Sequence, residues 1–427
     1  MLYAGIDIGK TTHYISVLFP GKLADYPRHE RGPTLKIENS REGFEKLLAT
    51  ISQYGQPDQC SILLERTGHY GVPLEHFLLE AGCNLYHITP KRRYGRDKTD
   101  RKDAMALAII LYNHLELRTP VVDSKQHIWP VAASSPAAKL RYPIQRRYDL
   151  QREATRRKNQ LTSICDQVFP ELTQVYKNPN SASALALREQ FPTPQLMMAA
   201  SIEELCATRL RTYPSKAQLK TLQELARIGI GTHDESQILE QQQLIVELRL
   251  HQRHIAKLDI QIEHAIRHCR EGKILMSIPG IGPLHAATLL ASIGCIARFK
   301  SDAKLRAYLG WAPQRDQTGS SRDRTTLTKA GNKLMRRTMF LIVCSAVKSD
   351  AKWKALYNRL VERKCAFDAE KGEYMGKMPV IGRIAGQLIR VMYVLLKRDY
   401  DLLQGLKDGE EPPEPQCYCT EKHLIKG

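Results

Sequence analysis

Residues 4–12 read AGIDIGKTT, and this segment decides how the N-terminal domain folds. It fits a relaxed phosphate-loop pattern in which Ala4 replaces the first glycine and Gly9, Lys10 and Thr11 follow after four residues. A working phosphate loop needs a helix directly after it, because the helix amides hold the phosphates. The sequence that follows is THYISVLF, with β-branched and aromatic residues at a period of two. The segment therefore predicts a β-hairpin, not a nucleotide-binding loop.

Strand and helix patterns alternate over the first 110 residues or so. After the hairpin, SREGFEKLLATISQYG and GVPLEHFLLEAG have helical periodicity, whereas CSILLER and NLYHITP are short apolar runs typical of buried strands. These elements predict a mixed α/β domain over residues 1–115 whose first two strands are antiparallel.

The carboxylate of Asp7 lies in the first strand between apolar residues, where burial is costly unless it meets a metal or a cation. Two kinds of ribonuclease H-like protein place an aspartate there: polynucleotide nucleases and transposases, and the actin-like or sugar-kinase ATPases. The ATPases need a second Asp-Gly phosphate turn and a glycine-rich adenosine pocket, and the sequence offers neither. The nucleases need further carboxylates, which are present.

Three further acids complete the candidate set with Asp7. Glu65 is the acidic residue that ends the apolar run SILLE, and Asp100 and Asp103 lie three residues apart on one face of a predicted helix. Four such acids could bind two magnesium ions about 4 Å apart for phosphoryl transfer. The alternatives are a helix N-cap for Asp100 and a surface ion pair for Glu65. Asp97 competes for the helix position, but it lies in the basic run KRRYGRDK, which is better suited to phosphates.

The rest of the chain is largely helical. Two long helical patterns, one strongly basic, predict an antiparallel helix pair or coiled coil within residues 116–272. A third unit covers residues 273–405, and the proline- and glutamate-rich tail 406–427 is predicted to be disordered. The all-α part thus follows an α/β part.

Composition narrows the class of partner. The chain carries 64 Lys and Arg against 45 Asp and Glu, a formal charge of +19 that is spread over every region and favours nucleic acid. Its apolar runs are short and interrupted by charge, so we expect no membrane span and no signal peptide. The ten cysteines form no CxxC pair, which favours reduced thiols in a cytoplasmic protein.

The C-terminal unit contains two groups of residues that suit DNA. IPGIGPLHAATLLASIG has the form of a helix-hairpin-helix, in which Gly280 and Gly282 would let backbone amides approach a phosphate. Downstream, hydroxyl residues lie among basic residues that could offset the charge of a phosphoryl-transfer transition state. The hydroxyl candidates are Thr318, Ser320 and Ser321; the basic candidates are Arg322, Arg324, Lys329, Lys333, Arg336 and Arg337. A polar loop that binds phosphates without covalent chemistry is the alternative, and spacing alone slightly favours it.

Together these motifs resemble the IS110 family of transposases, also called bridge recombinases, and the related Piv-type DNA invertases. GIDIGK, LLERTG and TDRKDA are similar to the family's RuvC-like DEDD domain, and IPGIGP, YLGWAP and LTKAGNKLMRR to its C-terminal transposase domain. The resemblance implies a RuvC-like domain, a coiled-coil middle that assists homo-oligomerisation to a dimer or tetramer, and a helical domain bearing a catalytic serine. It also implies a nucleoid-associated bacterial enzyme.

The resemblance further implies a mechanism. Family members cut and rejoin donor and target DNA through a phosphoserine link, with Mg²⁺ at the acidic site and a structured noncoding bridge RNA as guide. Asp7, Glu65, Asp100 and Asp103 match the four acids. Most members have Ser-Gly where this chain has Thr318-Gly319, and many carry a serine three places on, which corresponds to Ser321. We therefore rank Ser321 and Ser320 first as nucleophiles and keep Thr318 as the aligned candidate.

The middle region is longer than the family minimum, and we expect it to contact RNA or a neighbouring subunit. A candidate RNA surface on its basic helix comprises Arg146, Arg147, Arg152, Arg156 and Arg157, although a solvated charged face is the ordinary explanation. Two other functions compete with recombination. One is a metal-dependent RuvC-like nuclease without covalent chemistry, and the other is an inactive nucleic-acid-binding derivative of a transposase.

Overall fold

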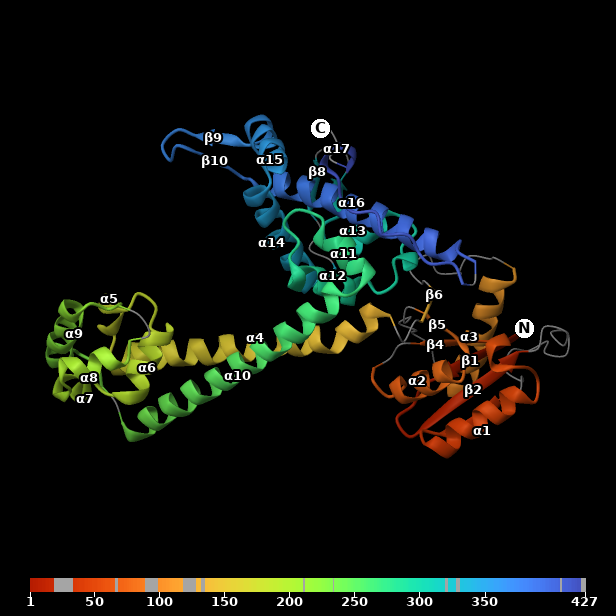
Figure 1. Cartoon of the computed structure of the whole chain (residues 1–427), viewed down its shortest axis with the longest axis horizontal. Helices are drawn as coiled ribbons and strands as arrows, with labels where there is room; N and C mark the ends of the chain where they lie inside the picture. The colour runs from red at the N-terminus through yellow and green to blue at the C-terminus, as the bar shows by residue number, and fades with distance from the viewer. Residues whose placement is uncertain are drawn as a thin grey trace. The chain divides into compact units, whose positions relative to one another are not determined.

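A computed structural model gives the fold of the chain (Figure 1). The structure describes residues 1–18, 34–65, 68–88, 99–117, 128–131, 135–209, 212–232, 234–318, 322–327, 331–407 and 409–423. The chain divides into two compact units, the first made of residues 1–140 and 268–427 and the second of residues 141–267. The first unit contains the N-terminal sheet domain and the C-terminal helical domain.

The sheet domain is built on six strands in the order β3-β2-β1-β4-β5-β6. Strands β1, β4 and β5 are parallel to one another, and β2, β3 and β6 pair antiparallel to their neighbours. The elements are β1 (Leu2–Asp7), β2 (Thr12–Leu18), β3 (Thr34–Glu38), α1 (Arg41–Ser52), the 3-10 turn η3 (Pro57–Gln59), β4 (Cys60–Glu65), α2 (Val72–Glu80), β5 (Asn84–Ile88), α3 (Asp100–Leu115) and β6 (Ile128–Pro130).

The predicted β1–β2 hairpin is confirmed, with Ile6 opposite Ile15 and Asp7 opposite Tyr14. Strands β3 and β6 were not anticipated from the sequence. Because β6 pairs with β5 at residues 128–130, the sheet continues beyond residue 115, where the sequence analysis ended the domain.

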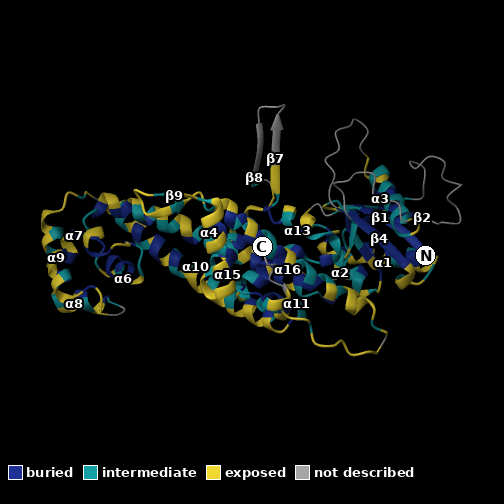
Figure 2. Cartoon of the chain, turned by 90° about the horizontal axis from the view of Figure 1, so that it is seen from above, coloured by how far each residue is buried: buried dark blue, intermediate teal, exposed yellow. Residues whose placement is uncertain are grey.

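Each face of the sheet is covered by its own helices. Ala4, Ile6, Ile62 and Leu64 belong to the core cluster that includes residues of α1 and α2. The alternate side chains, among them Tyr3 and Leu63, belong to a second cluster with residues of α3. In Figure 2 the central strands β1 and β4 are coloured mainly as buried residues. The period-two alternation of a strand thus divides the domain into two cores.

The second unit is a pair of long helices, α4 (Pro136–Val168, which begins in the first unit) and α10 (Glu235–Arg267), with short helices between them. The helices are antiparallel: near one end Arg147 pairs with Asp259 at 2.7 Å, and toward the other Gln237 donates to the side chain of Gln167 at 2.9 Å. The short helices are α5 (Leu172–Val175), α6 (Ala182–Gln190), α7 (Pro194–Ala199), α8 (Ile202–Ala207) and α9 (Lys216–Ile228). The predicted antiparallel helix pair is therefore confirmed.

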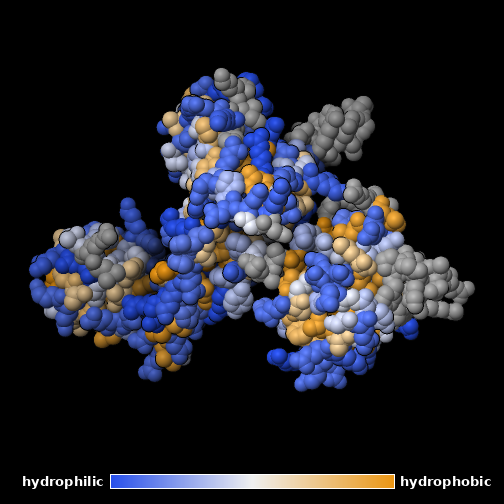
Figure 3. All heavy atoms as spheres, turned by 45° about the vertical axis from the view of Figure 1, so that its right-hand side comes forward, coloured by the Kyte–Doolittle hydropathy of each residue, from blue (hydrophilic) through white to orange (hydrophobic). Residues whose placement is uncertain are grey.

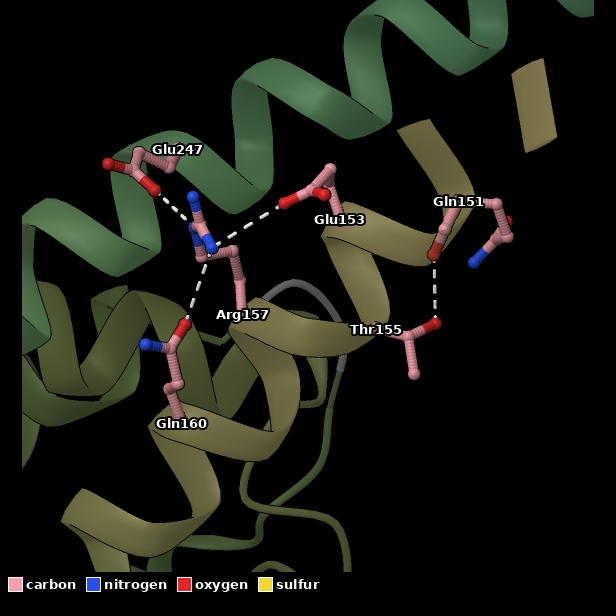
Figure 4. A network of polar contacts seen from close by, with 6 residues as sticks. All are labelled: Gln151, Glu153, Thr155, Arg157, Gln160 and Glu247. Atoms are coloured by element: carbon pink, nitrogen blue, oxygen red, sulfur yellow. Dashed lines mark hydrogen bonds and ion pairs between the residues drawn. The ribbon is translucent and has the colours of Figure 1, made fainter. Parts of the chain in front are cut away.

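Apolar and ionic contacts join the two long helices. Leu161 and Ile164 of α4 cluster with Leu244 and Leu248 of α10. Beside this seam, Arg157 contacts Glu247 on α10 and Glu153 and Gln160 on its own helix (Figure 4).

The C-terminal domain is mainly helical and centres on α16. Its elements are α11 (Arg270–Met276), α12 (Pro283–Ile293), the 3-10 turn η4 (Ile296–Arg298), α13 (Asp302–Tyr308), β7 (Pro313–Thr318), β8 (Arg322–Leu327), α14 (Lys333–Ser349), α15 (Ala351–Lys364), β9 (Ala366–Asp368), β10 (Glu373–Met375), α16 (Met378–Gln404) and α17 (Thr420–His423). By length and composition α16 could cross a membrane, but 56% of its apolar window is buried against the rest of the domain. Core helices pass the same test, so this is weak evidence for a span.

The prediction of a disordered tail is wrong for the residues that the structure describes there. The backbone N–H of Tyr418 donates to Ser277 Oγ at 2.8 Å, and its hydroxyl accepts from the indole of Trp353 at 3.1 Å. Lys273 pairs with Glu414 at 3.6 Å. An aromatic anchor, together with these polar contacts, lets a proline-rich segment pack on the domain.

Candidate active site

The parallel register of β1 and β4 places two of the predicted acids side by side. Ile6 is the partner of Leu64, so Asp7 and Glu65, the next residues, end the two strands together. Asp7 lies four residues after Tyr3, and Glu65 lies two residues after Leu63, so both acids belong to the sheet face that α3 covers. Both are half-buried.

Helix α3 brings the other two acids to the same corner. A Cβ on Gly5 would lie 2.1 Å from Ala104 O and 2.4 Å from Ala108 N, so α3 crosses β1 in backbone contact at this glycine. Asp100 and Asp103 occupy the helical turn just before Ala104. The first turn of α3 therefore lies beside the strand end that carries Asp7.

The first turn of α3 is capped by Thr99, whose hydroxyl accepts from Lys102 N at 3.4 Å. The alternative role of Asp100 as the N-cap is therefore wrong, because Asp100 is already the first helical residue. Both acids lie at the helix N-terminus, where the helix dipole favours negative charge. Asp100 is exposed and Asp103 is half-buried.

The four carboxylates suit magnesium by donor type, because Mg²⁺ prefers oxygen ligands. In the described residues, however, no three His, Cys, Asp or Glu side chains are grouped closely enough to hold one ion. The structure thus brings the acids to one corner without closing them into a ligand shell. Asp97, the competing acid, lies outside the described residues.

Two polar residues near Asp7 were missed by the sequence analysis. His13 is fully buried, burial lowers its pKa, and its Nδ1 accepts from Gly9 N at 3.3 Å in the β1–β2 turn. Asn39 donates its side-chain amide to Lys10 O in the same turn. In the sequence, Asn39 is indistinguishable from the polar residues that precede any helix start, and only its contacts reveal it.

One of the three predicted hydroxyl residues, Thr318, ends a strand of a β-hairpin. Strands β7 and β8 pair antiparallel, with Thr318 opposite Arg322 as the last pair before the connection. The backbones of Thr318, Arg322 and Arg324 therefore lie in these strands, which the sequence analysis had treated as a polar loop. Ser320, Ser321 and Lys329 lie outside the described residues.

The glycine turn between α11 and α12 is shaped by contact with the protein itself. Gly280 has a positive φ of 84°, and a Cβ there would lie 2.5 Å from Ala346 N and Ile342 O of α14. This packing explains the glycine without a phosphate. Gly282 differs, because a Cβ there would meet nothing within 4 Å, so this end of the turn is open. Phosphate contact at either glycine stays a prediction.

The basic residues at the start of α14 differ in exposure. Asn332 caps the helix by accepting from Leu334 N at 2.9 Å. Lys333 and Arg337 are exposed, whereas Arg336 is half-buried and its carbonyl accepts from the indole of Trp311 at 3.2 Å. Lys333 and Arg337 are thus available to a phosphate backbone.

Comparison with known proteins identifies two segments of the chain. A family model for DEDD-type transposases of IS110 matches residues 4–170. A second model, described as the transposase IS116/IS110/IS902 family, matches residues 272–358. The first includes the sheet domain with its four acids, and the second includes the glycine turn, the β7–β8 hairpin and α14.

Whole-length relatives agree with these matches. The insertion element IS110 uncharacterized 43.6 kDa protein of Streptomyces coelicolor is 24% identical and covers 93% of this chain and 94% of its own length. The insertion element IS900 uncharacterized 42 kDa protein of Mycobacterium paratuberculosis is 22% identical, covering 84% and 88%. The mini-circle putative transposase for IS117 of S. coelicolor is 24% identical, covering 84% and 87%.

Proposed function

The chain belongs to the IS116/IS110/IS902 family of transposases, and from this premise we propose that it cuts and rejoins DNA at the ends of an insertion sequence. The domain match implies the use of a divalent metal. The observation that carries the proposal is the contact between α3 and Gly5. It explains how carboxylates almost 100 residues apart in sequence reach one corner of the sheet.

In the proposed site, Asp7, Glu65, Asp100 and Asp103 hold Mg²⁺. The bound ion supplies Lewis acidity to a phosphoryl transfer on DNA. The two strand-end acids are fixed by sheet register, whereas Asp100 and Asp103 depend on the first turn of α3. We infer that DNA or another part of the complex completes the ligand shell, since the described acids by themselves do not form one.

The nucleophile we propose is a hydroxyl of Ser321 or Ser320, with Thr318 as the aligned candidate. Its oxygen attacks a phosphorus of the DNA backbone, the deoxyribose oxygen leaves with a proton, and a phosphoserine link results. Attack by a deoxyribose hydroxyl of the partner strand reverses the step and rejoins the DNA. Arg322, Arg324 and Lys329 offset the charge of the transition state.

Nucleic acid is the partner that the chemistry of the chain favours. The net charge is +19, and hydrophilic residues cover most of the face in Figure 3, where apolar residues form small separate groups. Of the five predicted arginines on α4, Arg147 and Arg157 pair with acids of α10, whereas Arg146, Arg152 and Arg156 are exposed, Arg152 with an ion pair to Asp149 on its own helix. The three exposed arginines are the candidates for contact with a guiding bridge RNA. In a homo-oligomer, the hydroxyl and the acids could come from different copies.

Trapping the covalent intermediate tests the proposed nucleophile. Full-length protein is mixed with the noncoding RNA of its element and both DNA partners, and the adduct is mapped by mass spectrometry. We expect a DNA-linked peptide that contains Ser320 and Ser321. The double change Ser320→Ala with Ser321→Ala should abolish strand exchange. The single change Thr318→Ala should leave strand exchange intact. An adduct that survives the double change would move the assignment to Thr318.

The same mixture separates recombination from the competing functions. A metal-dependent nuclease would cut DNA in Mg²⁺ without retaining protein on the ends, and an inactive derivative would bind without cutting. Asp7→Ala should abolish strand exchange while DNA binding persists. Full activity in that variant would overturn the acidic site.

A further inference from the structure

Asn39 lies between β3 and α1. Its side chain joins two segments at the end of the sheet where β1 and β4 finish. The amide Nδ2 donates to Lys10 O at 3.1 Å and to Tyr70 O at 3.3 Å. The backbone N–H of Asn39 donates to Thr11 O at 2.9 Å. One residue therefore makes three polar contacts to backbone carbonyls of segments that precede and follow it in the chain.

The two bridged loops begin at the two strand-end acids. Lys10 lies three residues after Asp7, and Tyr70 lies five residues after Glu65. The loops also touch each other, because a Cβ on Gly71 would lie 3.2 Å from Ile8 Cδ1. The Asn39 amide is therefore a tie between the residues that follow Asp7 and the residues from 68 on, which follow Glu65 in the chain.

A second residue, His13, also holds the β1–β2 turn. His13 Nδ1 accepts from Gly9 N at 3.3 Å, and the ring is fully buried against Phe44 of α1. With Gly9 fixed by His13, and Lys10 and Thr11 fixed by Asn39, each residue of the turn after Ile8 is anchored. Of these contacts, the hydrogen bond from Asn39 Nδ2 to Tyr70 O is the one that connects the turn to the segment after Glu65.

We propose that Asn39 is a positioning residue: it holds together the segments that follow Asp7 and Glu65, and so supports the orientation of the two carboxylates that strand register brings side by side, and through it the affinity of the site for a divalent cation. This inference rests on the proposed function of the two acids. Mg²⁺ demands near-ideal octahedral geometry, so a site whose carboxylates turn freely because the segments after them are untied binds it less well. Residues that orient metal ligands commonly change metal affinity by about 10-fold or more when removed.

The chain offers a matched control at Asn84. Its side-chain amide donates to Asp58 O at 2.6 Å, also in the sheet domain. Asn84 is the first residue of β5, so this bond lies at the opposite end of the strands from the acids. Asn84→Ala therefore removes the same kind of bond without touching the loops after β1 and β4.

The test measures binding of Mn²⁺, used as the probe, to the full-length protein by electron paramagnetic resonance. Wild type is compared with Asn39→Ala, Asn84→Ala and Asp7→Ala, each checked for folding by thermal unfolding. We expect Asn39→Ala to weaken Mn²⁺ binding about 10-fold and Asn84→Ala to leave it unchanged. DNA cleavage by Asn39→Ala should need more Mg²⁺ for half-maximal rate and recover its full rate at saturating Mg²⁺.

Two different results overturn two different statements. If Asp7→Ala loses Mn²⁺ while Asn39→Ala binds it as wild type does, the positioning role is wrong and the acidic site stands. If Asp7→Ala itself binds Mn²⁺ normally, the proposed acidic site fails. Should Asn39→Ala unfold at the measuring temperature, Asn39→Leu, which keeps the volume of the side chain but removes the donor, replaces it. Wild-type affinity in that folded variant, together with an unchanged Mg²⁺ requirement, refutes the role.

Discussion

The sheet domain and the helix pair of the second unit both bring distant residues together, but by different contacts. In the sheet domain, α3 and β1 approach so closely that Gly5 has no room for a side chain. In the helix pair, α4 and α10 are joined by interlocking side chains, with Leu161 and Leu248 in the seam and Arg147 paired with Asp259 beside it. The candidate site in the sheet domain therefore depends on backbone contact, whereas the helix pair depends on contacts between side chains.

Gly5→Ala should have the largest effect. The added methyl would lie 2.1 Å from Ala104 O, a backbone atom that cannot move without shifting α3. Overpacking of this kind typically lowers the free energy of unfolding by about 1–3 kcal/mol and occasionally by more, and we expect it to fall by about 3 kcal/mol in this variant. Amide hydrogen exchange of β1 and α3 measures it. Gly55→Ala is the control, since a methyl added there meets only Oε1 of the flexible Gln59 side chain, at 3.3 Å. Equal losses in the two variants would show that the contact between α3 and Gly5 is not tight.

Arg188→Ala should have the next largest effect, in the second unit. This arginine is 2% exposed and donates to Gln241 Oε1 at 2.7 Å, to Leu161 O at 2.8 Å and to Pro179 O at 3.2 Å. Its removal leaves buried acceptors without a donor, which costs about 2–3 kcal/mol. Urea unfolding measures the loss. Arg227→Ala, which removes an exposed pair with Glu224, should cost well under ~1 kcal/mol, and a similar loss from both variants would contradict the prediction.

The Arg157–Glu247 pair should contribute less. Both side chains are partly exposed, at 21% and 47%, so water screens their attraction. A double-mutant cycle with Arg157→Ala and Glu247→Ala should give a coupling energy of about 0.2–1 kcal/mol that shrinks in high salt. A coupling energy of several kcal/mol that does not change with salt would contradict this prediction. The Arg157–Glu247 pair would then behave like the buried hydrogen bonds of Arg188.

Acid should weaken the sheet domain through His13. Burial lowers the pKa of this histidine, so the unfolded chain takes up a proton at a higher pH than the folded chain does. The contribution to stability is therefore fully present above the ordinary value of about 6.5 and declines as the pH falls toward the lower folded value. Urea midpoints at several pH values measure the slope, and His13→Asn should flatten it. A midpoint that rises in acid would contradict this prediction.

Periodicity predicted the elements that local sequence can specify. The β1–β2 hairpin followed from period-two residues after Gly9, and the two long helices followed from long helical patterns, the first strongly basic. Strands β3 and β6 were not predicted from the sequence, because each is short and depends on a neighbouring strand that is already in place. The β7–β8 hairpin was not predicted either, since its polar sequence has no alternation of apolar and polar residues to indicate strands.

The candidate site divides in the same way. Asp7 and Glu65 were identified from sequence because each is a lone acid that ends an apolar run, and Asp100 and Asp103 because they share a helix face. The exposure of individual arginines on α4 could not be read in this way, because Arg146 and Arg147 are neighbours in sequence and only the second faces α10.

By itself the sequence determined the strand and helix periods, the positive charge and the choice of the four candidate acids, because these are properties of residue type and local spacing. Tertiary structure alone decided that α3 crosses β1 at Gly5, that Asn39 ties the loops after β1 and β4, and that Gly280 packs on α14. Those contacts join residues tens of positions apart, and their geometry exists only once strand register and helix packing have fixed the backbone.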